Sequence, residues 1–300
     1  MSSFSPPASS TTFFDGADAI PSFTLATYNV NFGSFVNGPV SSEQVPGAAL
    51  RVSEALLATR ADVVLLQETN EGWQAFFSAS PLLSQQYRTQ HWLHPGLSGY
   101  FAAGSAILVN DVLFDLVDVH AIPTAQDVPG EYFDQLAALI RRKTDGKLIR
   151  LINVHLRPPL PMAQSEGSGV FASLKVYFWT SPDVHRSEIE YCLGHVRREY
   201  PDAHATVLAG DFNEGSKGGV GYLLELGFST VLHRVAGNAT TWYWPVIGGM
   251  SIFGQYDHIF FQESELQFQN VQIYRDYRDA SDHLPVSASF GMADLTTNQV

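Results

Sequence analysis

The sequence predicts an α/β fold in which two packed β-sheets are flanked by helices. Many short runs are apolar or alternate between apolar and polar residues, whereas few stretches have helical spacing, and these fall between the strands. Several strand runs are apolar without a break, which is typical of a sheet covered on both faces. The chain has 300 residues, of which 45% are hydrophobic, so it can build a core for such a fold.

The expected strands are apolar or alternating runs bounded by polar or turn residues. In chain order they are Phe23–Asn29, Val63–Gln67, Ser105–Val109, Val112–Ala121, Phe133–Arg141, Leu148–His155, Ala205–Ala209, Gln255–Phe261, Leu266–Ile273 and Pro285–Phe290.

The expected helices lie between these strands. Apolar residues recur at helical spacing over Pro46–Thr59. Ser181 is a typical N-cap, and Pro182 after it suits the first helical position of a helix that runs to about residue 200. A short helix is expected over Gly221–Leu226. Two segments rich in Gly, Pro or Ser are expected to be loops, Arg157–Thr180 and Gly237–Gly254.

The strand pattern has no seam, so we expect an N-terminal arm over residues 1–20, a single domain over 21–292 and a C-terminal tail over 293–300. The first residues have neither a basic region nor a long apolar region, so no signal peptide is expected. No apolar run approaches the roughly 20 residues that a transmembrane helix needs. We therefore expect a cytoplasmic monomer without an integral membrane segment. The lone cysteine, Cys192, excludes an intrachain disulfide.

Short polar clusters stand at the ends of the apolar runs, where rigid scaffold meets solvent. They are Tyr28-Asn29-Val30-Asn31, Leu66-Gln67-Glu68-Thr69, Asn153-Val154-His155-Leu156, Gly210-Asp211-Phe212-Asn213, Tyr256-Asp257-His258-Ile259 and Ser281-Asp282-His283-Leu284-Pro285.

These side chains suit hydrolysis of a phosphate ester. The carboxylates of Glu68, Asp211 and Asp282 are hard donors that favour Mg²⁺ or Mn²⁺ over softer metals. Asn29 and Asn213 can each offer an oxygen to a metal or an N–H to a phosphate.

Histidines supply the proton chemistry. His283 is the natural general base, because its ordinary pKa lies near working pH, and Asp257 is the candidate to orient it. A protonated His155 can donate to the phosphate.

Each residue also has an ordinary structural explanation. A carboxylate at a strand end is commonly solvated, Asp211 followed by Asn213 is typical of an Asx turn, and His155 alone can be structural. Independent turns would not need this combination in one chain, so the joint pattern favours a shared site.

In this order the motifs resemble those of the endonuclease/exonuclease/phosphatase superfamily, which has the DNase I-like fold. The resemblance runs from about Thr24 to Phe290 and is most specific at Gly210-Asp211-Phe212-Asn213 and Ser281-Asp282-His283-Leu284-Pro285-Val286. It implies a four-layer α/β sandwich and a divalent metal, Mg²⁺ or Mn²⁺.

The resemblance also implies residue roles. Glu68 would be the principal metal ligand, Asn29 would support the metal or the phosphate, and Asp282 would complete the acidic cluster. His155 would bind the phosphate, and Asp211 and Asn213 would position the nucleophile and the scissile group. Asp257 would orient His283.

The sequence favours a nuclease acting on DNA or RNA, with a small or lipid phosphoester as the alternative substrate. The net charge of −13 and the lack of a basic strip keep the alternative open. A non-catalytic scaffold would have no use for the full residue set.

Few residues are candidates for contacts with the substrate. Arg157 could meet a phosphate or pair with an acid, and Asn31 is a second candidate. The basic cluster Arg141-Arg142-Lys143 precedes a hairpin turn signal and could flank the turn or touch a nucleic-acid backbone. The aromatic segment Trp242-Tyr243-Trp244 could stack bases, enter a membrane interface or pack on the core.

Overall fold

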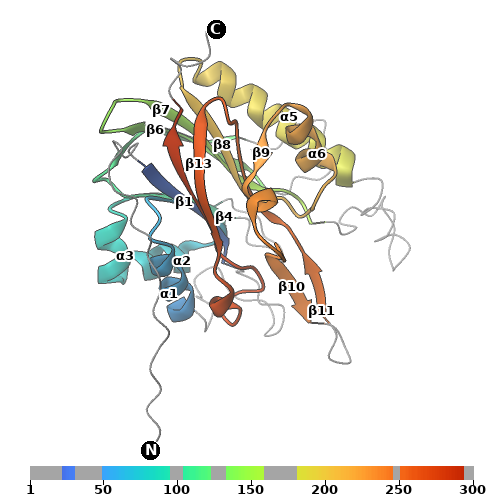
Figure 1. Cartoon of the computed structure of the whole chain (residues 1–300). Coiled ribbons are helices and arrows are strands. Elements are labelled where there is room, and N and C mark those ends of the chain that lie inside the picture. The colour runs from blue at the N-terminus through green and yellow to red at the C-terminus, as the bar shows by residue number, and fades with distance from the viewer. Residues whose placement is uncertain are drawn as a thin grey trace, which may run out of the picture.

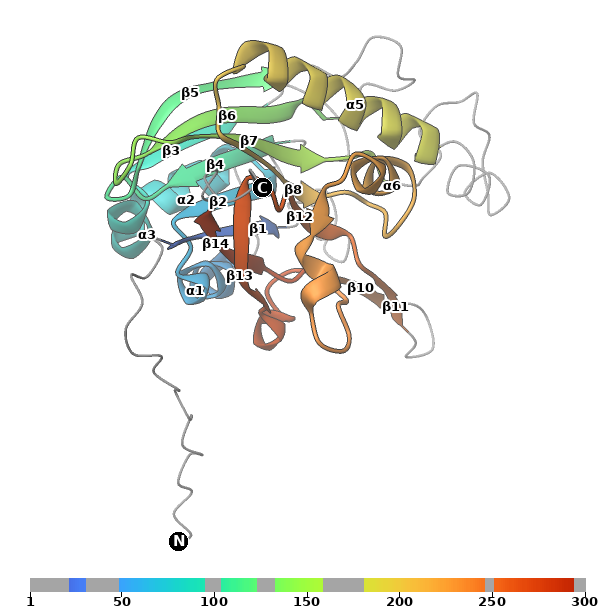
Figure 2. The same cartoon turned by 45° about the horizontal axis from the view of Figure 1, so that its top comes forward.

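Two six-stranded mixed sheets pack face to face, and helices cover their outer faces (Figures 1 and 2). The computed structural model describes residues 22–30, 49–94, 104–122, 133–158, 181–245 and 251–293. The order of layers is helix, sheet, sheet, helix, which confirms the predicted α/β sandwich.

The first sheet has the strand order β13-β14-β1-β2-β4-β3. Its strands are β1 (Ser22–Asn29), β2 (Val63–Thr69), β3 (Thr89–Leu93), β4 (Gly104–Val109), β13 (Leu266–Ile273) and β14 (Val286–Met292). The central strands β1 and β2 are parallel, and helix α1 (Ala49–Thr59) lies between them in the chain. All other pairs in this sheet are antiparallel.

The second sheet has the order β5-β6-β7-β8-β12-β9. Its strands are β5 (Phe114–Ile122), β6 (Gln135–Arg142), β7 (Leu148–His155), β8 (Ala205–Asp211), β12 (Asp257–Phe261) and β9 (Ser229–Thr230). Again the central pair, β7 and β8, is parallel, helix α5 (Ser181–Glu199) lies between them, and the flanking pairs are antiparallel. The two sheets thus have the same pattern of parallel and antiparallel neighbours, although no residue repeat reveals it.

The apolar core lies between the sheets and under the helices. In β2, Leu65 packs between the sheets, whereas Val64 and Leu66 pack against the helices on the outer face. Because side chains alternate along a strand, a strand covered on both faces must be apolar throughout. This is the physical origin of the unbroken apolar runs.

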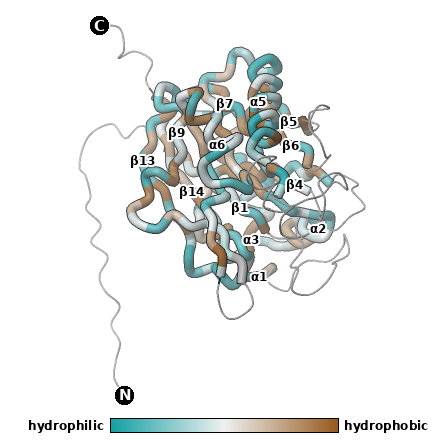
Figure 3. Tube along the Cα trace, turned by 90° about the vertical axis from the view of Figure 1, so that its right-hand side faces the viewer, coloured by the Kyte–Doolittle hydropathy of each residue, from teal (hydrophilic) through white to brown (hydrophobic). Residues whose placement is uncertain are grey.

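Each outer face has its own helices. Helices α1, α2 (Glu71–Ala79) and α3 (Pro81–Gln86) contribute to the cluster on the first sheet. Helix α5 and helix α6 (Gly218–Glu225), which contact each other, cover the second sheet. Along its trace α5 alternates between hydrophobic and hydrophilic stretches, as an amphipathic surface helix does (Figure 3). No helix in the described ranges is long and apolar enough to cross a membrane.

Some short elements were not predicted. Helix α2 begins after Asn70, whose side chain accepts a hydrogen bond from Trp73 N at 2.8 Å, so an N-cap signal was present in the sequence. The segment 237–254, expected to be a loop, contains the antiparallel strands β10 (Trp242–Pro245) and β11 (Ser251–Gly254). That expectation was wrong, because the pair is stabilised by bonds to residues distant in sequence. Of the loop expected over residues 157–180, the part from residue 159 on lies outside the described residues.

Strand β2 contains an irregularity that matters for the site. Its register against β4 shifts between Gln67 and Thr69, so Glu68 is the extra residue of a bulge and has a φ of 56°. A bulge re-aims a side chain at a strand end. Opposite the bulge stands Gly104, where an added Cβ would lie 2.1 Å from the carbonyl oxygen of Thr69. Only glycine fits this approach.

We therefore expect Gly104→Ala to lower the free energy of unfolding by about 2–3 kcal/mol, as overpacking does. The matched control is Gly221→Ala in α6, where the nearest neighbour of the new Cβ is Ser216 O at 3.5 Å. Replacing this helical glycine should stabilise the protein by about 0.5–1 kcal/mol. Urea unfolding of both variants is the measurement, and a neutral Gly104→Ala would contradict the close approach.

Candidate active site

The functional candidates meet at one edge of the sandwich. Asn29, Glu68, His155 and Asp211 stand at or near the C-terminal ends of β1, β2, β7 and β8, the two central parallel pairs. Glu68 is the most accessible of the four, with 23% of its side chain exposed. The other three are buried. Equivalent strands of the two halves thus supply equivalent positions of one site.

Asn29 joins the two sheets. Its amide nitrogen donates to Glu68 Oε1 at 3.1 Å in the first sheet and to Asp211 Oδ2 at 3.0 Å in the second. The Ser281 hydroxyl donates to the backbone oxygen of Asn29 at 2.9 Å, which ties the segment before β14 to the same point. One amide group therefore sets the separation of the two carboxylates.

The carboxylates lie in an electrostatically unfavourable place. Burial, followed by the charge of Asp282, raises the pKa of Glu68 to about 7. Burial also raises the pKa of Asp211 to about 6. Asp211 contributes further to the shift of Glu68, so like charges share one pocket.

The loop after β8 has a defined conformation. Gly210 lets the chain pass Val154, because a Cβ there would lie 1.8 Å from Val154 O. Asn213 adopts a left-handed φ of 50°, and its N–H donates to Asp211 Oδ1 at 2.8 Å. This is the Asx turn that the sequence allowed, and Asn tolerates that conformation. The Asn213 side chain donates to Leu156 O at 2.8 Å.

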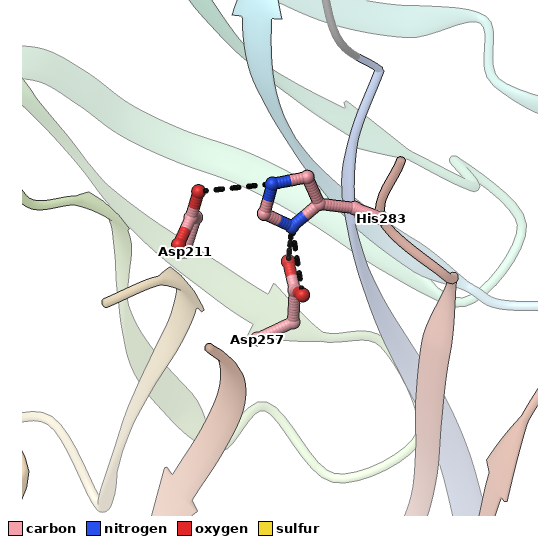
Figure 4. Close-up of side chains that lie close together, drawn as sticks. All are labelled: Asp211, Asp257 and His283. Carbon is pink, nitrogen blue, oxygen red and sulfur yellow. Dashed lines mark hydrogen bonds and ion pairs between the residues drawn. The ribbon is translucent and has the colours of Figure 1, made fainter. Parts of the chain in front are cut away.

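His283 is held between two aspartates (Figure 4). Its Nδ1 lies 2.9 and 3.1 Å from the two oxygens of Asp257, and its Nε2 lies 3.5 Å from Asp211 Oδ2. Burial alone would lower the pKa of His283, but Asp257, Asp211 and Asp282 outweigh it and raise the pKa well above its ordinary value. The pairing fixes the proton on Nδ1 and points Nε2 into the site.

His155 differs from His283 in charge. Burial, with a smaller contribution from His283, lowers the pKa of His155 to about 3, so the ring is neutral. Its Nε2 lies 3.9 Å from both Glu68 Oε1 and Asp211 Oδ2. A neutral ring donates from one nitrogen only, and these carboxylates favour the proton on Nε2.

Residues that the sequence did not single out position His155. Phe133 stacks on its ring at 4.0 Å between centroids and 5° between planes. The side chain of Gln135 accepts from His155 N at 2.7 Å and donates to His155 O at 2.9 Å. No local sequence signal marks either residue.

Trp242 connects the β10–β11 pair to the acidic cluster. Its indole N–H donates to Asp282 Oδ2 at 3.1 Å, and its ring stacks on Tyr256 at 4.9 Å. Tyr243 N donates to Asp282 O at 3.0 Å. Trp242 therefore orients a candidate metal ligand, and the side chain of Trp244 lies outside the described residues.

The structure describes one of the two candidates for substrate contact, Arg157. Asn31 lies outside the described residues. Arg157 is completely buried, and its charge lowers the pKa of Glu188 in α5. Arg157 therefore acts on a buried acid of α5, and its contact with a substrate phosphate stays a prediction.

Two sets of groups could hold a metal ion. Asp211, Asp257 and His283 each present a ligand atom, and these atoms lie within 4.8 Å of one another. Both oxygens of Asp257 already face His283 Nδ1, however.

The pocket of Glu68, Asn29 and Asp282 offers hard oxygen donors. Burial is the largest cause of the raised pKa of Glu68, but the negative charges of Asp282 and Asp211 add to it, and these like charges are what a cation would neutralise. The residues present thus fit a Mg²⁺ or Mn²⁺ ion.

A family model described as the Endonuclease/Exonuclease/phosphatase family matches residues 26–283. The chain belongs to this family. Its members are hydrolases that act on phosphoesters. The predicted resemblance is confirmed, whereas comparison with curated proteins gave no match.

Solved structures share the fold. The catalytic domain of human Nocturnin with bound sulfate has a TM-score of 0.65 at 16% identity, over 91% of this chain and 94% of that one. An endonuclease/exonuclease/phosphatase from Bacteroides vulgatus has a TM-score of 0.64 at 15% identity, over 91% of this chain and 100% of that one. TDP2 from D. rerio, complexed with a single-strand DNA product, has a TM-score of 0.59 at 14% identity, over 90% of this chain and 99% of that one. At such identities the likeness shows the fold alone.

The raised pKa of Glu68 predicts a pH-dependent stability in the absence of metal. The folded protein holds this proton up to about pH 7, whereas an unfolded Glu releases it near its ordinary pKa. The tighter binding of this proton stabilises the folded state fully below the pKa of the unfolded Glu. This contribution to the free energy of unfolding is lost as pH rises through the folded pKa of about 7.

Glu68→Gln should therefore be more stable than the wild type at pH 8 by about 1–2 kcal/mol, with a smaller difference near pH 5. Urea unfolding in EDTA at both pH values measures it. If the free energy of unfolding changed equally with pH in the two proteins, the neighbours of Glu68 would not raise its pKa.

Proposed function

We propose that this protein is a divalent-metal-dependent phosphodiester hydrolase whose substrate is a nucleic acid. The observation that carries the proposal is the alignment of Asp257, His283 and Asp211. An oriented imidazole faces a carboxylate beside the acidic pocket. The arrangement can hold a water molecule and accept its proton, which hydrolysis of a phosphate ester requires.

Glu68 and Asp282, supported by Asn29, would hold the metal. When bound, a Mg²⁺ or Mn²⁺ ion supplies positive charge that neutralises phosphoryl oxygens and polarises the ester. The Trp242 indole would keep the Asp282 carboxylate turned toward this place.

His283 is proposed as the general base. Its pKa is raised by three carboxylates, so positive charge that neutralises Asp211 and Asp282 lowers it toward the range where the ring is neutral. Asp257 keeps the proton on Nδ1, so that Nε2 accepts the proton of the attacking water. Asp211 would orient that water.

His155 and Asn213 are proposed to bind the phosphate. The neutral His155 donates from Nε2; its ring is fixed by stacking on Phe133, and its backbone is held by Gln135. The side-chain amide of Asn213 lies on the loop directly after Asp211. Groups held this rigidly need little reorganisation when charge develops on the phosphoryl oxygens.

A nucleic acid is favoured as substrate by one neighbour in fold, since the D. rerio TDP2 structure contains a single-strand DNA product. The Nocturnin structure contains a sulfate anion, which resembles a phosphate of any ester. The half-buried Trp242 beside the site offers an aromatic ring near the proposed scissile phosphate.

The alternative substrate, a small or lipid phosphoester, is favoured by the distribution of charge. Arg142 pairs with Asp145, and Lys143 pairs with Asp115 at 3.1 Å. Two of the three basic residues are therefore paired with acids near the β6–β7 turn, and the chain has a net charge of −13. Such a protein has little general attraction for polyanions.

Hydrolysis assays test the proposal. Plasmid DNA, single-stranded RNA, bis-p-nitrophenyl phosphate, p-nitrophenyl phosphate and sphingomyelin are each offered with EDTA, Mg²⁺ or Mn²⁺. Metal-dependent cleavage of DNA or RNA supports the proposal. Cleavage of the small or lipid esters alone moves the function to the alternative, and turnover unaffected by EDTA would overturn the metal requirement.

Replacing the proposed base should abolish most turnover. His283→Ala is expected to reduce kcat by about 10²–10⁴-fold, because proton transfer is lost. Asp257→Asn, which removes the orienting charge, should reduce it by a comparable factor, because it can favour the wrong tautomer.

The matched control is His204→Ala, since His204 is exposed and its Nδ1 accepts from Leu148 N far from the site. It should keep wild-type kcat. Steady-state kinetics with circular dichroism measures all three variants, and near-normal kcat in folded His283→Ala would remove His283 from the mechanism.

A further inference from the structure

Behind the site, four ionisable residues are buried together. They are Arg157, His185, Glu188 and Glu214, with exposures of 0%, 1%, 3% and 8%. Two come from α5, and the others follow β7 and β8 directly. None belongs to the acidic pocket described above.

Their hydrogen bonds form a closed circuit. Glu214 Oε2 lies 2.9 Å from His185 Nδ1, and His185 Nε2 lies 2.9 Å from the backbone oxygen of Arg157. Leu156, one residue earlier, accepts from the side chain of Asn213 at 2.8 Å, and Asn213 precedes Glu214 in the chain. The loop after β8 and the end of β7 are therefore joined twice, once by Asn213 and once through His185.

The chemistry of the contacts favours a positive charge on His185. An ionised carboxylate and a backbone carbonyl only accept hydrogen bonds, so beside an ionised Glu214 both ring nitrogens donate. Burial works against that charge, yet Glu214 raises the pKa of His185 above its ordinary value. The other oxygen of Glu214 accepts from Val220 N at 2.7 Å and so also anchors α6.

A second buried acid belongs to the same cluster. Burial raises the pKa of Glu188 to about 7, although His185 and Arg157 act in the opposite direction. Its Oε2 has no hydrogen-bond partner among the described residues. Around it, Ile189, Cys192 and Leu193 form an apolar layer that would pack a helix without any charge.

Burying charges in this layer is costly, and apolar residues often replace buried ion pairs with no loss of stability. The cluster therefore needs a reason other than helix packing. One member, Glu214, follows Asn213, whose left-handed backbone needs support from its surroundings. Another, Arg157, lies two residues after His155 in the chain.

We infer that His185 and Glu214 are positioning residues, which fix Asn213 and the end of β7 in the geometry needed for phosphate binding; this rests on the proposed function. Neither residue touches the substrate. They act through the two backbone segments that carry Asn213 and His155.

Loss of this circuit should lower kcat more than it changes KM. His185→Ala should reduce kcat by about 10–100-fold, because misplacement of catalytic groups by about 1 Å costs that much, with KM within about threefold. His185→Gln restores a donor toward Arg157 O and should recover part of the loss.

The matched control is His195→Ala on the same helix. His195 contacts His120 at 3.2 Å instead of the circuit. It should keep wild-type kcat.

Because His185→Ala can fail to fold, Glu214→Gln is the second variant. It preserves the size of the side chain and weakens only the charged bond. We expect a loss of about tenfold in kcat with an unchanged far-UV spectrum.

Hydrogen exchange gives a readout independent of turnover. In His185→Ala and Glu214→Gln, residues 211–216 and 155–158 should exchange faster than in the wild type, whereas His195→Ala should leave them unchanged. If the wild type shows no turnover, the proposed function fails, and exchange still tests the circuit. Wild-type kcat and exchange in folded Glu214→Gln, or equal losses in His195→Ala, would overturn the inference.

Discussion

The side-chain amide of Asn29 joins the two sheets at the point where their acidic side chains meet. It donates to Glu68 in one sheet and to Asp211 in the other. Gln67, the register partner of Asn29 in β2, makes a second link between the sheets. Its amide donates to Asn153 Oδ1 in β7 at 2.6 Å, and the Asn153 amide donates back to Leu66 O at 2.8 Å. Apolar packing between sheets is not directional, whereas these bonds are, so amides set the register in which the strand ends face each other.

This register concentrates negative charge, and the charge explains the unusual protonation of the site. Glu68 and Asp211 hold protons more tightly than isolated carboxylic acids do, because they are largely shielded from water and face other acids. The same field raises the pKa of His283, whereas His155 lies against Phe133 and stays neutral. Two histidines in one pocket thus have different charges and can serve different steps. A divalent cation is the group that such a pocket favours.

The sequence predicted the longer strands but not β3, β9, β10 or β11. It also predicted the helices α1, α5 and α6 and the convergence of the strand-end residues, because these depend on local patterns. Interactions between segments that are distant in sequence could not be predicted from local patterns. The contact of Trp242 with Asp282 and the stack of Phe133 on His155 require the folded chain. The same holds for β10, which bonds through its backbone to the segment before β14, and for β11, which pairs with β10. Arg157 shows the limit most clearly, because its position two residues past His155 suggested the site, and only the fold shows that it is buried and that its charge acts on Glu188 of α5.

Asn29, Glu68 and Asp282 are proposed to form the divalent-metal site in which the family's chemistry takes place. A crystal of the protein grown with millimolar Mn²⁺ tests this site directly through anomalous scattering. We expect an anomalous peak about 2.2 Å from a carboxylate oxygen of Glu68, the distance at which Mn²⁺ bonds to oxygen donors. A peak between Asp211, Asp257 and His283, or no peak in the pocket, would contradict it.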